Sequence, residues 1–332
     1  MFQIICYGVR PNEVEIFKKF NRYGYALTLE EALLTHENIE TAKGHDAVLL
    51  RGNCVADRDN LAKMKEYGIR YVFSRTVGYN HIDLEAAKEF GQIIARVPGY
   101  SPRSVAELAL TLGMTLLRNV QYTADRTHRG DFRITPRMFS REIRNCTVGI
   151  VGVGRIGLAE AKLYRGLGAR VLGYDFYPSK AAQKVVEFTD LDTLARTADI
   201  VSIHVPYFKG ENDNFVNAEF IEKMKDDAIL VNTARGELVD LTAVADALEE
   251  NRLYGFATDV IPNERDTYFR RFDAVDAIPD PAVVRLVSCY PRALITPHVG
   301  SNTDEAVENM VETSLDNFNE ILTTGTCTNL LR

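Results

Sequence analysis

The chain has 332 residues, 46% of them hydrophobic, and this length favours two domains over a single hydrophobic core. It contains no run of about 18 uncharged apolar residues and no basic leader with a cleavage site, so we expect neither a membrane-spanning helix nor a signal peptide. The net charge of −7 argues against nucleic acid as a partner.

The cysteines and histidines show no disulfide or metal framework. The five cysteines lie far apart and form no CxxC pair, and the six histidines form no HExxH motif. We therefore expect free thiols in a reducing cytoplasm, and no metal.

The first hundred residues alternate short apolar runs with amphipathic segments such as 12–20 and 57–68. This alternation is typical of parallel strands separated by helices. The expected strands are FQIICY (2–7), YALTL (25–29), DAVLL (46–50), RYVFSR (70–75) and QIIARV (92–97).

A long helix is expected from residue 102 to about 127, where apolar residues recur at helical spacing after the helix-start signal SPRS. This segment is more apolar than a surface helix should be, so it either packs in its own domain, crosses between domains or contacts a second subunit. A second alternating series then runs through TVGIV (147–151), ARVLGYD (169–175), ADIVSIHVP (198–206), DAILVNTA (227–234), YGFATDV (254–260) and RALITPH (292–298).

The pattern predicts an α/β chain with two doubly wound parallel-sheet domains, one flavodoxin-like and one of the Rossmann type. A terminal helix over 302–322 returns to the first domain. We place the first domain at 1–100 plus 300–332 and the second at 101–299.

The stretch VGIVGVGRIG carries Gly152, Gly154 and Gly157 in the spacing G-x-G-x-x-G, between a strand and a helix. Asp175 ends the next strand, which completes the dinucleotide fingerprint. The glycines allow a tight turn, close approach of the pyrophosphate and close packing of the helix. We expect the pyrophosphate at the helix N-terminus, near Arg155 and Ile156. Asp175 would bind the ribose hydroxyls and repel a 2′-phosphate, so NAD is expected rather than NADP.

Four residues that suit carbonyl reduction follow strands of the second series: Arg235, Asp259, Glu264 and His298. The carboxyl ends of parallel strands form the ligand-binding edge of such a sheet. An arginine can hold a carboxylate through two hydrogen bonds, and a histidine can give a proton to the neighbouring carbonyl as hydride arrives. A carboxylate near the histidine favours its charged form.

The chain resembles the NAD-dependent D-2-hydroxyacid dehydrogenases of the D-lactate type. The motifs that carry the resemblance run from about residue 75 to 301: TVGYNHID, RVPGYSPRSVAELAL, TVGIVGVGRIG, HVPYF, LVNTARGELVD, TDV and LITPHVGS.

The resemblance implies a role for each matching residue. Arg235 binds the substrate carboxylate, His298 is the acid/base, and Glu264 pairs with His298. The other implied residues are Val77, Gly78 and Tyr100 on the substrate side, and His204, Val205, Pro206, Thr233, Ala234 and Asp259 around the cofactor. The (R) configuration of the product and a homodimer formed by the nucleotide domains are implied in the same way.

Arg51 follows an apolar strand of the first domain, within the stretch LRGNC. A guanidinium enclosed by domain closure needs an anion, because an unpaired buried charge is costly. The expected substrate is therefore 2-oxoglutarate, whose second carboxylate would pair with Arg51. The stretch also resembles the subgroup of (R)-2-hydroxyglutarate and (R)-2-hydroxyisocaproate dehydrogenases of amino-acid fermentation. Alternatively, Arg51 points to solvent or pairs with Asp57 or Asp59, and Arg75 could serve the same purpose.

Other activities stay open at this point. The substrate could be D-lactate or (R)-2-hydroxyisocaproate, and the chain could belong with phosphoglycerate or formate dehydrogenases. A non-enzymatic NAD-sensing corepressor is the remaining class. The set of Arg235, Glu264 and His298 argues against it.

Overall fold

The computed structural model describes residues 1–99 and 101–331. It divides into two compact units, the first comprising Met1–Ser101 with Asn302–Arg332 and the second Pro102–Ser301. Among the described residues, no helix combines the length and the hydropathy needed to cross a membrane.

The first unit is built on a five-stranded sheet in the order β2-β1-β3-β4-β5, with all paired strands parallel. This is the order of a flavodoxin-like sheet. Its strands are β1 (Gln3–Tyr7), β2 (Ala26–Glu30), β3 (Ala47–Leu50), β4 (Tyr71–Ser74) and β5 (Ile93–Ala95).

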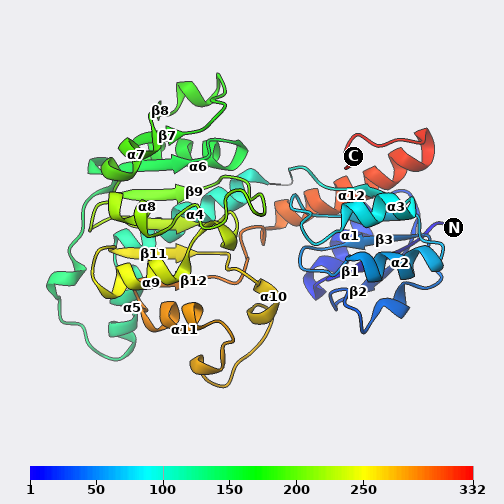
Figure 1. Cartoon of the computed structure of the whole chain (residues 1–332), viewed down its shortest axis with the longest axis horizontal. Helices are drawn as coiled ribbons and strands as arrows, with labels where there is room; N and C mark the ends of the chain where they lie inside the picture. Colours follow the sequence, from blue (N-terminus) through cyan, green and yellow to red (C-terminus); the bar gives the residue numbers. More distant parts are fainter. Residues whose placement is uncertain (100, 332) are drawn as a thin grey trace. The chain divides into compact units, whose positions relative to one another are not determined.

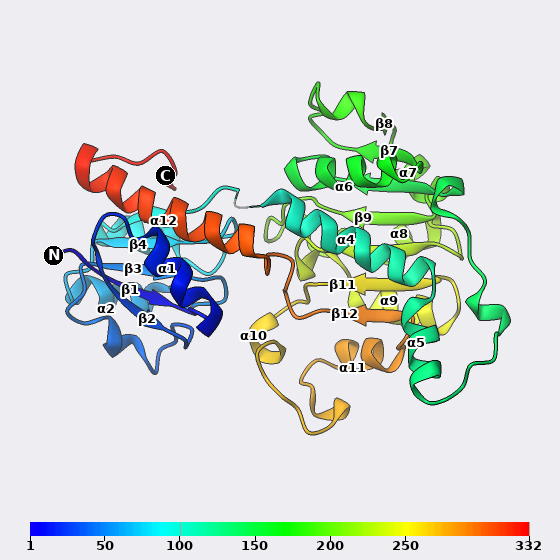
Figure 2. The ribbon, with the colours of Figure 1, turned by 180° about the vertical axis from the view of Figure 1, so that it is seen from behind.

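Helices cover both faces of this sheet. One face packs against α1 and α12 through Phe17, Leu315 and Phe318, and the other against α2 and α3 through Leu61 and Ala86. The two views of the ribbon show these layers from opposite sides (Figures 1 and 2). The helical elements are η1 (Pro11–Glu13), α1 (Val14–Phe20), η2 (Ile39–Ala42), α2 (Arg58–Glu66), α3 (Leu84–Phe90) and α12 (Asp304–Thr324).

The second unit contains a seven-stranded sheet in the order β12-β11-β10-β9-β6-β7-β8, again with all paired strands parallel. The order reverses at β6, which is the arrangement of a doubly wound dinucleotide-binding sheet. The strands are β6 (Thr147–Val151), β7 (Arg170–Tyr174), β8 (Glu187–Phe188), β9 (Ile200–Ile203), β10 (Ile229–Asn232), β11 (Gly255–Thr258) and β12 (Ala293–Ile295).

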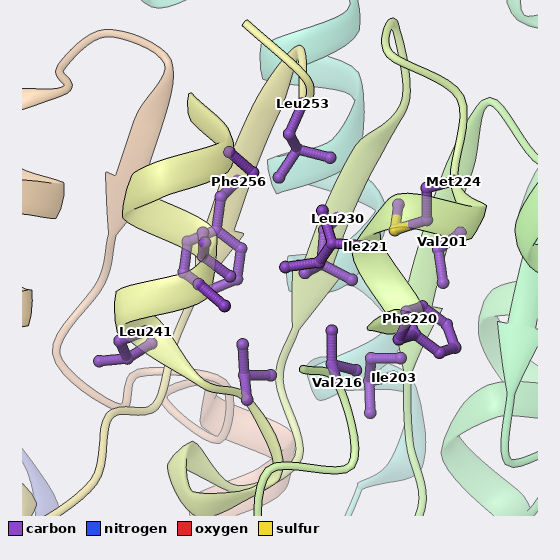
Figure 3. Packing of buried hydrophobic residues seen from close by; sticks show 14 of the residues in the cluster. Val201, Ile203, Val216, Phe220, Ile221, Met224, Leu230, Leu241, Leu253 and Phe256 are labelled. Carbon is purple, nitrogen blue, oxygen red and sulfur yellow. The ribbon is translucent and has the colours of Figure 1, made fainter. Parts of the chain in front are cut away.

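Each face of the second sheet has its own hydrophobic cluster. Helices α4 and α6 cover one face, and α7, α8, α9 and α11 cover the other. Figure 3 shows the cluster on the face covered by α7, α8, α9 and α11, where Phe220 and Ile221 of α8 pack over Val201 and Leu230 of the sheet. The helices are α4 (Pro102–Leu117), α5 (Val120–His128), α6 (Arg155–Gly166), α7 (Leu191–Thr197), α8 (Ala218–Lys223), α9 (Leu241–Glu249), α10 (Glu264–Thr267) and α11 (Pro281–Ser288). Short 3-10 turns are η3 (Pro136–Met138), η4 (Ile143–Asn145), η5 (Ala182–Lys184), η6 (Gly236–Leu238) and η7 (Val275–Ala277).

The prediction of two doubly wound parallel sheets is confirmed, with two local differences. The helix expected over 102–127 is two helices, because Asn119 adopts a left-handed conformation with φ 50° between α4 and α5. The Oδ1 atom of Asn119 accepts a hydrogen bond at 2.8 Å from the hydroxyl of Tyr254, the residue directly before β11. This bond fixes the position of the break. Strand β8 was not expected, and its two residues are too few to give a pattern.

Candidate active site

The glycine turn after β6 is packed so closely that side chains would not fit. Gly152 has φ +92°, and a Cβ atom there would lie 2.8 Å from the main-chain carbon of His204. A Cβ on Gly157 would lie 2.1 Å from the carbonyl oxygen of Gly152. These contacts account for two of the three glycines of the fingerprint.

The N-terminus of α6 is open toward the region where the pyrophosphate is expected. Gly154 is its N-cap and forms no side-chain capping bond, and a Cβ there would have no neighbour within 4 Å. Arg155 is exposed and Ile156 is half-buried. An uncapped N-terminus of a twelve-residue helix, next to open space, fits a bound phosphate group.

Asp175 lies directly beside this turn. One carboxylate oxygen accepts the N–H of Val153 at 2.8 Å and the other accepts the N–H of Tyr177 at 2.8 Å. Thr233, after β10, is buried, and its hydroxyl has no partner among the described residues. An orphaned hydroxyl and an open helix N-terminus are features that a bound dinucleotide would satisfy, so the residues fit NAD. Val205, Pro206 and Ala234 lie in the loops after β9 and β10, at the same sheet edge.

His298 and Glu264 form a hydrogen-bonded pair. Nδ1 of the imidazole lies 2.8 Å from Oε2 and 3.0 Å from Oε1 of the carboxylate. The side chain of His298 is 36% exposed and that of Glu264 only 12%, so the imidazole is the more accessible partner. His298 has φ 53°, in the left-handed region that a non-glycine residue adopts at a cost.

Asp259 holds the loop that carries His298. Its Oδ1 accepts bonds from the hydroxyl of Thr296 at 2.5 Å and the N–H of Val299 at 2.8 Å. Its Oδ2 accepts the N–H of Gly300 at 2.8 Å. Burial raises the pKa of Asp259 above its usual value, while these three bonds act in the opposite direction. The carboxylate therefore fixes the backbone on both sides of the histidine.

Arg235 lies in a tight turn after β10. The buried amide of Asn232 spans the turn, donating to the carbonyl of Arg235 at 2.8 Å and accepting the N–H of Ala234 at 3.0 Å. Next to Arg235, a Cβ atom on Gly236 would lie 2.0 Å from the main-chain carbon of Ile261. The turn with Arg235 is thus packed directly on the segment that leads to Glu264.

In the first unit, Arg51 belongs to a cluster of charged groups at the carboxyl ends of β1, β3 and β4. Its guanidinium lies 3.6 Å from Glu13 and donates to the carbonyl of Gly8 at 3.3 Å. Arg75 is only 1% exposed and binds the same carboxylate at 2.9 Å. Arg51 therefore does not pair with Asp57 or Asp59, and Arg75 is committed to Glu13.

The loop with Val77 and Gly78 is held through its carbonyl groups. Arg96 donates to the carbonyl of Val77 at 2.8 Å, and Thr76 donates to that of Gly78 at 2.8 Å. Among the described residues, no hydrogen bond engages the N–H groups of these two residues. Tyr100, the remaining residue expected on the substrate side, lies outside the described residues.

Sequence reasoning brought out Arg235, Glu264, His298 and the glycine turn, but missed Glu13 and Gly236. Glu13 lies in a short 3-10 turn far along the chain from Arg51, so no spacing rule connects them. Gly236 stands in the quoted stretch TARGEL, and its need for close backbone contact could have been inferred there.

The fold and these residues define an NAD-dependent oxidoreductase. The chain belongs to the family of D-isomer specific 2-hydroxyacid dehydrogenases, whose NAD-binding domain matches residues 110–300.

Related proteins cover the chain from end to end. An aromatic 2-oxoacid reductase of Clostridium sporogenes is 37% identical over 329 residues, covering 98% of each chain. A D-lactate dehydrogenase of Escherichia coli is 34% identical and covers 99% of each chain. The structure of a D-lactate dehydrogenase with NAD⁺ from Lactobacillus jensenii is similar with a TM-score of 0.85, at 32% identity and with 100% of both chains covered.

Proposed function

We propose that this NAD-dependent D-2-hydroxyacid dehydrogenase reduces 2-oxoglutarate to (R)-2-hydroxyglutarate. In this proposal, Arg235 binds the carboxylate next to the keto group, and His298 gives a proton to the carbonyl oxygen from Nε2. NADH, when bound, supplies the hydride that completes the reduction. Glu264 sets the orientation of the imidazole through the contact of 2.8 Å to Nδ1, which is the observation that carries these roles.

The substrate assignment rests on the charge of the cluster around Arg51. The guanidinium groups of Arg51 and Arg75 share a single carboxylate, that of Glu13, whose Oε2 also accepts the main-chain N–H of Arg10 at 3.1 Å. The side chain of Asn302 accepts from Arg10 at 2.5 Å and from Arg51 at 3.4 Å, which adds no charge. Burial, followed by the charge of Arg75, lowers the pKa of Arg51 to about 10. A second substrate carboxylate would neutralise part of this positive surplus.

A panel of 2-oxoacids tests the assignment. We expect 2-oxoglutarate to give the highest kcat/KM among 2-oxoglutarate, oxaloacetate, pyruvate and 2-oxoisocaproate with NADH. Arg51→Ala should lower kcat/KM for 2-oxoglutarate by about one to two powers of ten and leave that for pyruvate unchanged.

The matched control is Arg58→Ala, which removes an exposed arginine of the same unit that pairs with Glu89. This variant should behave as the wild type with every substrate. Equal losses on pyruvate and 2-oxoglutarate in Arg51→Ala would show that Arg51 acts on the structure and not on the distal carboxylate.

A second candidate substrate is an aromatic 2-oxoacid. It is favoured by the 37% identity to the aromatic 2-oxoacid reductase of C. sporogenes. Phenylpyruvate therefore belongs in the same panel. A kcat/KM for phenylpyruvate well above that for 2-oxoglutarate would replace the first assignment and leave the roles of Arg235, Glu264 and His298 in place.

We propose further that the enzyme works as a homodimer in the cytoplasm. The segment between α5 and β6 carries three exposed apolar side chains, Phe132, Ile134 and Phe139, which a second subunit would cover. The free cysteines among the described residues are compatible with a reducing compartment. Light scattering after gel filtration should give twice the mass of one chain for the wild type. The double variant Phe132→Asp/Ile134→Asp should give the mass of one chain.

A further inference from the structure

A carboxylate buried inside the second unit contacts the histidine that follows β9. Glu160 of α6 is 0% exposed, and the side chain of His204 is 2% exposed. Oε2 of Glu160 lies 2.5 Å from Nε2 of His204, and the hydroxyl of the buried Ser202 lies 3.1 Å from the same nitrogen. A carboxylate removed from water needs such a partner, because its desolvation is costly.

This pair connects two backbone segments on either side of the glycine turn. Glu160 belongs to the helix that begins at Gly154, and His204 begins the loop after β9. The N–H of His204 donates to the carbonyl of Val151 at 2.7 Å, and Gly152 packs on the main chain of His204. Although the imidazole is buried, His204 as a whole is half-buried, so the part that reaches solvent is its main chain.

The cluster is poorly satisfied for a purely structural core. Oε1 of Glu160, Nδ1 of His204 and the hydroxyl of Tyr164 are buried without a partner among the described residues. Burial, followed by the charge of Glu160, raises the pKa of Tyr164 well above its usual value. Apolar residues of the same volume would fill this space at a lower cost. The polar pair must therefore contribute something besides stability.

We propose that Glu160 is a positioning residue for the dinucleotide. By holding the imidazole of His204 in the core, it fixes the main chain of residues 204–206 against the glycine turn. The backbone that would contact the cofactor is then already in position before NADH binds. Binding therefore costs less conformational entropy in residues 204–206.

The test is direct binding of NADH, measured by fluorescence without a 2-oxoacid. Glu160→Met keeps the volume and removes both the charge and the hydrogen bond, and Glu160→Gln removes the charge alone. We expect Kd for NADH to rise about tenfold in Glu160→Met and less in Glu160→Gln. The KM for the 2-oxoacid and kcat at saturating NADH should stay near the wild-type values. If Glu160→Met does not fold, the same comparison is made with Glu160→Gln.

Asp199→Asn is the matched control. Asp199 is also a buried acid of this unit, paired with Arg141 and Lys225, but it precedes β9, at the opposite end of the strand from His204. This variant should lose thermal stability and keep the wild-type Kd. An unchanged Kd in both Glu160 variants, or an equal rise in Asp199→Asn, would overturn the proposal.

A double variant separates stability from position. Glu160→Met combined with His204→Met removes both polar partners, and its thermal stability should recover relative to Glu160→Met alone. We expect Kd for NADH to remain high, because no side chain then anchors the loop. Recovery of Kd together with stability would show that packing alone sets the loop, and would overturn the role of Glu160.

Discussion

Oε2 of Glu264 lies 2.8 Å from Nδ1 of His298, and this contact leaves Nε2 as the imidazole nitrogen without a hydrogen-bond partner among the described residues. None of the described residues forms a hydrogen bond with Nε2 of His298. The half-exposed imidazole thus turns its free nitrogen away from the carboxylate that orients it. A group that donates a proton to a substrate must combine such access with a fixed direction.

Replacing Glu264 by glutamine should slow proton transfer. The amide fills the same volume and can still accept a bond from Nδ1, but it is neutral and has one acceptor oxygen where the carboxylate has two, so it holds the imidazole less firmly. We expect kcat for 2-oxoacid reduction to fall about 100-fold, with the KM for NADH unchanged. Asp266→Asn, at an exposed acid of the same helix α10, serves as the control and should retain full kcat. Wild-type kcat in Glu264→Gln would contradict this role.

The choice between NAD and NADP should depend on Asp175. Its carboxylate would meet a 2′-phosphate with like charge, and it also holds the turn through the N–H groups of Val153 and Tyr177. In Asp175→Ser we expect kcat/KM with NADH to fall about tenfold and the preference for NADH over NADPH to narrow. Asp190→Asn, which changes the N-cap of α7, should cost stability only and leave the preference intact.

Substitution of Gly236 should damage both stability and activity. An alanine Cβ would lie 2.0 Å from the backbone of Ile261, which cannot move without shifting the segment before Glu264. We expect Gly236→Ala to lower the free energy of unfolding by about 2–3 kcal/mol and kcat/KM by at least tenfold. Gly166→Ala is the contrast, since no atom lies within 4 Å of its Cβ position in α6. In urea unfolding, the free energy of unfolding of Gly166→Ala should equal that of the wild type or exceed it by about 0.5–1 kcal/mol.

Alkaline pH should destabilise the fold partly through Cys6. Burial raises the pKa of this thiol from 9.0 to about 12, against the opposing charge of Arg75. The unfolded chain therefore loses the proton first, and the contribution of the thiol to stability, complete below pH 9, is lost as the pH rises from 9 to 12. Between pH 8 and pH 10.5 the wild type should lose about 2 kcal/mol more stability than Cys6→Ala. Parallel pH profiles of the two proteins would refute this.

The elements that the sequence predicted well depend on local chemistry. The glycine turn is an example, because Gly152, Gly154 and Gly157 lie within six residues, and the close packing of the turn requires two of them, Gly152 and Gly157. The parallel strands could also be predicted from the sequence, since most of them are short apolar runs between helical segments. The break between α4 and α5 at Asn119 could not be predicted in this way, because it is stabilised by Tyr254, a residue 135 positions away.

The partners of charged side chains escaped sequence reasoning for the same reason. Arg51 was expected to meet a substrate carboxylate, to point to solvent or to pair with a nearby aspartate. The structure instead places Glu13, which follows the neighbouring parallel strand β1, 3.6 Å from its guanidinium. The buried contact of Glu160 with His204 spans 44 residues and follows no motif. Such pairs arise only when the sheet brings distant loops to one edge.

Helix α12 has a consequence for the order in which the protein is made. Phe318 of this helix stacks on Phe73 at 4.3 Å, and the N–H of Leu331 donates to the carbonyl of Ile94 at 2.9 Å. The residues of α12, made after Pro102–Ser301, therefore complete the hydrophobic core of residues made before that segment. During synthesis of Pro102–Ser301, one face of the N-terminal sheet is covered by α1 but not yet by α12. Shortening the chain at its C-terminus would thus impair the most distant part of the sequence.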